Sequence, residues 1–121
     1  MSVAAWVAVA LLGGAGAVGR FLLDGAVSAR AGRDLPFGTL AVNLSGAFVL
    51  GLLTGVSLRG DALVLAGGAT LGSFTTFSTW MFETQRLSEE GEPRAGAANV
   101  AASLAAGLGA VALGRLIGSH V

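Results

Sequence analysis

The chain has 121 residues, of which 54% are hydrophobic, and its mean hydropathy is +0.78. A soluble domain is only about 45–50% apolar, so this composition excludes an ordinary soluble protein and predicts one that lies in a bilayer. Seven acidic and seven basic side chains cancel, which gives no reason to expect a nucleic-acid partner, and the absence of cysteine excludes disulfides and thiol chemistry.

Uncharged runs predict four membrane-spanning helices, at about residues 3–23, 36–58, 62–82 and 95–117. Each run is close to the ~20 apolar residues that a helix needs to cross the hydrocarbon core. The first run has no basic region before it, so we interpret it as a retained span rather than a secretory signal. The chain is therefore expected to be a single all-α, multi-pass membrane domain.

The first span ends in G-G-A-G-A-V-G-R-F, which places Arg20 near the membrane boundary. Arg20 has two interpretations: an anchor that reaches the lipid head groups, or a fixed positive charge at a vestibule that attracts anions. Residues 24–34 then form a polar connection. Five of the seven arginines belong to the side of the first and third connections, so the positive-inside rule favours a cytoplasmic location for both.

In the second span, Thr39 and Asn43 are four residues apart and share one helix face. Asn43 is the most polar side chain of this run. Its amide can hold two helices together, which is commonly worth about 0.6–2 kcal/mol in a membrane. It can also donate a hydrogen bond to a passing anion. The sequence leaves both interpretations open.

The third span concentrates five hydroxyl groups within seven residues: Ser73, Thr75, Thr76, Ser78 and Thr79. Lipid offers these groups no partner. One interpretation is that each hydroxyl bonds back to the carbonyl group four residues earlier. The dense cluster favours another, in which the helix is interrupted near residues 72–76 and its freed backbone groups line an ion path.

Two aromatic residues, Phe77 and Trp80, point to a similar face of the third span. Ring edges carry partial positive charge and can face an anion, although such pairs also serve in packing alone. Residues 83–94 hold four of the seven carboxylates and are expected to form a water-exposed loop. In the fourth span, Asn99, Ser103 and Gly107 follow one another at four-residue steps and predict a thin polar stripe facing the interior.

Four short spans enclose little volume, so a water-accessible pore in this chain is expected to need an oligomer. Two G-x-x-x-G pairs, Gly51/Gly55 and Gly68/Gly72, permit close helix approach within one chain or between subunits. No catalytic constellation is visible, and we expect no enzyme activity.

Three motifs, G-G-A-G-A-V-G-R-F, P-F-G-T-L-A-V-N-L-S-G-A-F and G-S-F-T-T-F-S-T, occur in this order along the chain. Together they resemble the CrcB/Fluc fluoride channels over nearly the whole sequence. The resemblance implies a passive, fluoride-selective channel in the bacterial plasma membrane that exports cytoplasmic fluoride and so confers fluoride resistance. It also implies an antiparallel dual-topology dimer with two pores, in which the third of four transmembrane helices is broken mid-membrane.

The resemblance also assigns roles to individual residues. Arg20 would lie at the vestibule, and the backbone carbonyls of Gly72 and Thr75 would hold a structural sodium ion at the dimer centre. The residues that would line the pore and bind fluoride are Asn43, Phe77, Ser78, Thr79, Trp80 and Ser103.

Two departures from the family pattern stand out. Trp80 occupies the position of the usual second phenylalanine, and Gly107 occupies a position where another hydroxyl is common. Because either could disable one pore, a heterodimer with a paralogous chain stays open beside the homodimer. The rival function is a small multidrug-type, proton-coupled transporter. It needs a carboxylate inside the membrane, and none of the four uncharged runs contains one.

Overall fold

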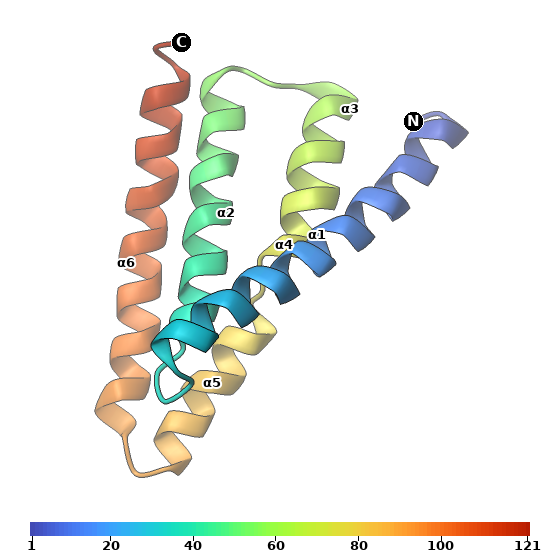
Figure 1. Ribbon diagram of the computed structural model, residues 1–121. Coiled ribbons are helices and arrows are strands. Elements are labelled where there is room, and N and C mark those ends of the chain that lie inside the picture. The colour runs from blue at the N-terminus through green and yellow to red at the C-terminus, as the bar shows by residue number, and fades with distance from the viewer.

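The computed structural model describes residues 1–121, which form helices joined by short connections and no strand (Figure 1). Three helices are long and apolar enough to cross a membrane: α1 (Val3–Ala31), α2 (Phe37–Gly55) and α6 (Pro93–Gly118). The all-α, multi-pass prediction is confirmed to this extent.

Between α2 and α6 the chain is a series of shorter helical segments. They are α3 (Gly60–Leu63), the π-helix η1 (Val64–Leu71), α4 (Gly72–Phe74) and α5 (Ser78–Glu89). The first three follow one another without interruption, and α5 continues after a break of three residues. Figure 1 shows this series running from one end of the molecule to the other, beside the three long helices.

The long helices and the interrupted series pack in a definite order. In Figure 1, both chain ends and the 56–59 turn lie at one end of the molecule, and the connections 32–36 and 90–92 lie at the other. α6 lies along α2, and α5 packs on the start of α6. α1 crosses diagonally and contacts α2, η1 and α4.

Glycines on both helices bring α2 and α6 into backbone contact. A Cβ atom added at Gly51 would collide with the carbonyl oxygen of Val111, and one added at Gly114 would collide with that of Phe48. The first predicted glycine pair is therefore used inside the chain. The second pair is not: a Cβ at Gly68 would meet nothing within 4 Å, and one at Gly72 would meet only a carbonyl oxygen at 3.9 Å.

The surface of the single chain is apolar and its interior is small. Only 13 of 121 residues are buried, whereas Val3, Leu11 and Phe21 are exposed by 82%, 70% and 76%. A soluble monomer rarely exposes large continuous apolar patches. This surface is instead the kind that lipid or another copy of the chain covers.

Helix α1 continues through much of the segment that was expected to be a polar connection. It ends only at Ala31, and Gly32 follows with a φ of 80°. Within the added turns, the Ser28 hydroxyl donates to the carboxylate of Asp24 at 3.2 Å. Residues 24–31 are compatible with a helix, so their polarity did not mark its end.

The expectation of a loop over residues 83–94 is wrong for its first half. Helix α5 extends through Glu89, where the Gln85 side chain donates to Glu89 at 3.2 Å and Leu87 is only 1% exposed. These residues favour a helix and bury one apolar side chain, although their charge excludes them from the hydrocarbon core. The non-helical connection is limited to residues 90–92.

Candidate functional site

The interrupted helix between η1 and α5 has the break that the hydroxyl cluster suggested. α4 ends at Phe74, Thr75 is extended with a φ of −80° and a ψ of 162°, and α5 begins at Ser78. The break therefore lies at residues 75–77, slightly beyond the expected 72–76, because Gly72 is still helical. A helix broken in this way exposes carbonyl groups on one side and N–H groups on the other.

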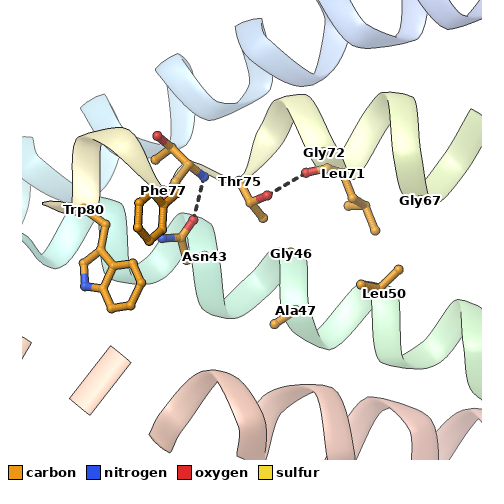
Figure 2. Close-up of a pocket in the computed structure, with 11 residues that line it drawn as sticks. Asn43, Gly46, Ala47, Leu50, Gly67, Leu71, Gly72, Thr75, Phe77 and Trp80 are labelled. Atoms are coloured by element: carbon orange, nitrogen blue, oxygen red, sulfur yellow. Dashed lines mark hydrogen bonds between the residues drawn. The ribbon is translucent and has the colours of Figure 1, made fainter. Parts of the chain in front are cut away.

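Asn43 on α2 holds the break open with both ends of its side-chain amide. Its Oδ1 accepts a hydrogen bond from the backbone N–H of Thr76 at 2.8 Å, and its Nδ2 donates to the carbonyl of Thr76 at 2.9 Å. Figure 2 shows Asn43 directly beside the non-helical backbone. The amide thus replaces two helical hydrogen bonds, and one Nδ2 hydrogen is left for another acceptor.

The interruption leaves three backbone groups near Asn43 without backbone hydrogen bonds. No N–H group of residues 75–77 donates to the carbonyl of Gly72, and none in the chain donates to that of Thr75. The N–H group of Phe77 donates to no backbone carbonyl. The same short segment therefore offers oxygen atoms to a cation and a donor to an anion.

Of the five hydroxyls of this region, some bond back to their own helix, as the first interpretation of the sequence expected, and others lie at the interruption, as the second expected. The hydroxyls of Ser73 and Thr75 bond back to the carbonyls four residues earlier, at 2.7 Å and 3.0 Å. The Thr76 hydroxyl lies 3.1 Å from that of Thr79 and accepts the N–H of Thr79 at 3.2 Å, which caps the start of α5. Ser78 is exposed and its hydroxyl stays available.

The two aromatic residues form a perpendicular pair. The ring centroids of Phe77 and Trp80 are 5.7 Å apart and the ring planes meet at 85°. Phe77 is 69% exposed, so most of its ring is free to face another molecule. Edge-to-face geometry turns the positive edge of one ring to the negative face of the other.

A pocket of about 370 Å³ brings several of the predicted residues together. Figure 2 shows Asn43, Phe77 and Trp80 at one end of it and apolar side chains of α2 and η1 at the other. The carbonyl-bearing Gly72 and Thr75 also line this pocket, and no charged side chain does. Any ion that enters it meets neutral groups only.

Other predicted residues lie outside this pocket. Ser103 is half-buried on α6, and Arg20 is half-buried on α1. Ser78 and Thr79 belong to the first turn of α5, next to Phe77. The single chain therefore does not assemble all the predicted pore residues around one space.

Sequence reasoning missed two residues that shape the site. Gly46 on α2 gives room to Thr75, because a Cβ atom there would collide with Cγ2 of Thr75. Thr84 on α5 accepts a hydrogen bond from Asn99 at 2.9 Å and donates to the carbonyl of Trp80 at 2.9 Å. Thr84 lies beyond the hydroxyl cluster, so no local pattern pointed to it.

Comparison with known proteins agrees with the family resemblance of the sequence motifs. Residues 7–115 match the family described as CrcB-like protein, Camphor Resistance (CrcB). A Mycolicibacterium paratuberculosis protein named fluoride-specific ion channel FluC 2 is 53% identical over 120 residues, which cover 99% of this chain and 98% of the relative. A Mycobacterium bovis protein of the same name is 49% identical over 117 residues, covering 97% of this chain and 93% of the relative. The Symbiobacterium thermophilum protein fluoride-specific ion channel FluC 1 is 42% identical over 119 residues, covering 93% and 96%.

Proposed function

The chain belongs to the CrcB-like family, and on this premise we propose that it is a passive, fluoride-selective ion channel. The relatives' names supply the identity of the ion. The observation in the structure that carries a channel mechanism is the interrupted helix held by Asn43, which presents hydrogen-bond donors in a pocket without charged side chains. Export of fluoride from the cytoplasm would protect the cell from its toxicity.

Neutral donors suit a channel that must bind an anion and release it again. An ion must bind well enough to enter a pore and weakly enough to leave it. A buried cation beside the path would hold fluoride too tightly, whereas the Phe77 N–H, the Ser78 hydroxyl and the remaining Asn43 hydrogen each offer one modest bond. The exposed edge of Phe77 adds partial positive charge without a formal charge.

The segment from Gly60 through Glu89 serves, in this proposal, as the third of four membrane spans and is broken mid-membrane. It runs between the two ends of the molecule beside the three long apolar helices, and both chain ends lie at the same end (Figure 1). An even number of crossings is needed for that arrangement. The Asn43 side chain satisfies both backbone groups of Thr76 at the break, which lipid could not do.

The working unit in this proposal is an antiparallel dual-topology dimer with two pores. Two features of the single chain support a second copy beside the break: the small residues Gly68 and Gly72 are free, since Gly68 faces open space and Gly72 is exposed, and Phe77 is mostly exposed. Small residues at a free face permit close approach of a second set of helices. Ser103 and Arg20, which lie outside the pocket of one chain, would then complete the pathway and its vestibule.

A structural sodium ion fits the donor set at the break. The carbonyls of Gly72 and Thr75 lack backbone partners, and unwound backbone carbonyls are the oxygen ligands that sodium takes in broken membrane helices. When bound, the cation would supply positive charge beside these two carbonyls. Within this chain, Asn43 orients the carbonyl-bearing segment by fixing Thr76.

A heterodimeric channel is the second candidate. Relatives carry names numbered 1 and 2, which is consistent with paired chains, and Trp80 and Gly107 depart from the usual pattern. The arginine distribution would also suit a chain inserted in one fixed orientation in the bacterial plasma membrane. The proton-coupled transporter has no comparable support, because no carboxylate lines the pocket.

Efflux from liposomes tests the proposal. The purified protein is reconstituted with internal potassium fluoride and some sodium, and a fluoride electrode follows release when valinomycin allows potassium to leave. Fast release that depends on valinomycin, with slow release of chloride in parallel vesicles, is the expected result. Trapped fluoride would reject the homodimeric channel. Release restored by a co-reconstituted paralogous chain would then establish the heterodimer.

A further inference from the structure

Three hydrogen bonds link Trp80 and Thr84 of α5 and Asn99 of α6 in a closed ring, and two of them join the two helices. The indole Nε1–H of Trp80 donates to the carbonyl of Asn99 at 3.4 Å. The Asn99 Nδ2 donates to the Thr84 hydroxyl at 2.9 Å, and that hydroxyl donates to the carbonyl of Trp80 at 2.9 Å. Thr84 thus uses its single donor and one of its acceptor positions within the ring.

This hydrogen-bonded ring determines which atoms of the Trp80 side chain face the pocket. Because the N–H group is bound to Asn99, the indole offers only carbon atoms to the space that it lines with Asn43 and Phe77. Figure 2 shows the indole nitrogen on the side of Trp80 that is turned away from Asn43. The indole N–H is therefore not a donor to an ion in this pocket.

The hydrogen-bonded ring also supports the aromatic side chain of Phe77. The Phe77 side chain is 69% exposed, and its aromatic partner within the chain is the perpendicular Trp80 ring at 5.7 Å. A rotation of the indole about its side-chain bonds would remove that support. The bond from the indole N–H to the Asn99 carbonyl holds the Trp80 side chain, and the Thr84 hydroxyl joins Asn99 to the backbone of Trp80, so together they keep the two aromatic rings in one arrangement.

We propose that Thr84 and Asn99 are positioning residues that hold the Trp80 indole against Phe77 and so maintain the rate of fluoride passage. This inference rests on the proposed function for its effect on flux. The arrangement of the rings themselves can be measured independently of any transport. Neither residue is assigned contact with the ion; both act through Trp80.

The test uses Trp80 as its own reporter. The chain has two tryptophans, and Trp6 lies near the start of α1 with 61% exposure, away from the site. In a Trp6→Phe background, Trp80 is the only tryptophan, so its fluorescence anisotropy reports the mobility of this indole. Thr84→Val keeps the shape of the side chain and removes the hydroxyl that closes the ring.

Thr84→Val is expected to lower the anisotropy of Trp80 and to reduce fluoride efflux by about five- to tenfold, the effect of losing roughly one net hydrogen bond. Thr84→Ser, which retains the hydroxyl, should match the parent in both measurements. Ser88→Ala is the matched control: its hydroxyl donates to the carbonyl of Thr84 at 3.2 Å and lies outside the ring, so both readouts should stay unchanged.

A double-mutant cycle separates positioning from general stability. Trp80→Phe keeps an aromatic ring but has no N–H group for Asn99, so Thr84→Val should cause no further loss of flux in that background. Equal losses with Trp80 and with phenylalanine, or unchanged anisotropy in Thr84→Val, would overturn the inference. If the parent passes no fluoride, the proposed channel function fails, and the anisotropy alone still decides whether Thr84 holds the indole.

Discussion

Asn43→Asp removes one of the two hydrogen bonds that this side chain makes to Thr76 and adds a negative charge beside the proposed ion path. The variant is nearly the same size, and its carboxylate still accepts the Thr76 N–H that now lies at 2.8 Å. It cannot donate to the Thr76 carbonyl at 2.9 Å, so two oxygen atoms face each other. Loss of that bond with its partner left unsatisfied costs about 1–3 kcal/mol.

The added charge has the larger effect on conduction. A carboxylate and a fluoride ion about 4 Å apart repel by about 4 kcal/mol at an effective dielectric constant of about 20. If this energy adds to the barrier, flux falls by roughly a thousandfold, since each 1.36 kcal/mol is about tenfold in rate. The expected phenotype is therefore a folded protein that conducts almost no fluoride.

Liposome efflux measured with a fluoride electrode gives the flux, and size-exclusion chromatography with thermal unfolding in detergent reports assembly and stability. Ser45→Ala is a matched control on the same helix, because the Ser45 hydroxyl only bonds back to the carbonyl of Val42 at 3.1 Å. It should conduct like the parent. An Asn43→Asp protein whose flux stays within threefold of the parent would refute the placement of Asn43 beside the ion.

The remaining predictions concern the aromatic ring, the glycine contact and the sodium site. Phe77→Ile should abolish fluoride efflux, because the aromatic edge is lost. The elution volume should be unchanged, because isoleucine keeps an apolar side chain at this 69% exposed position; an active variant would remove Phe77 from the pathway. Gly51→Ala should lower the unfolding temperature, because its Cβ would collide with the Val111 carbonyl and overpacking costs about 1–3 kcal/mol. Gly109→Ala has open space and should be neutral or stabilising, so equal melting of the two variants would contradict the packing argument. Replacing all sodium with N-methylglucamine should lower both thermal stability and flux, and full activity without sodium would exclude a structural ion at the Gly72 and Thr75 carbonyls.

The sequence was most informative where the bilayer imposes a simple rule. Long uncharged runs predicted the three helices that the structure confirms as long and apolar enough to span a membrane. Their ends were less predictable, because the edge of an apolar run marks the limit of the hydrocarbon region, whereas a helix can continue into water. Helix α1 does so as far as Ala31, and α5 as far as Glu89.

The candidate site depends on contacts between distant parts of the chain. The hydroxyl cluster predicted an interrupted helix, but the break lies at residues 75–77 because Asn43, 33 positions before Thr76, binds both of its backbone groups. Nothing in the local pattern of either segment encodes that pairing. Likewise, two identical glycine spacings serve different purposes, and only the packing shows that Gly51 meets α6 while Gly68 stays open.

The central claim, that neutral donors at a broken helix make this chain selective for fluoride, is tested most directly by the reversal potential across a planar bilayer. With fluoride on one side and an equal concentration of chloride on the other, the protein is predicted to give a current that reverses far from zero, in the direction set by fluoride. A reversal potential near zero, or at the value set by chloride, would contradict the account.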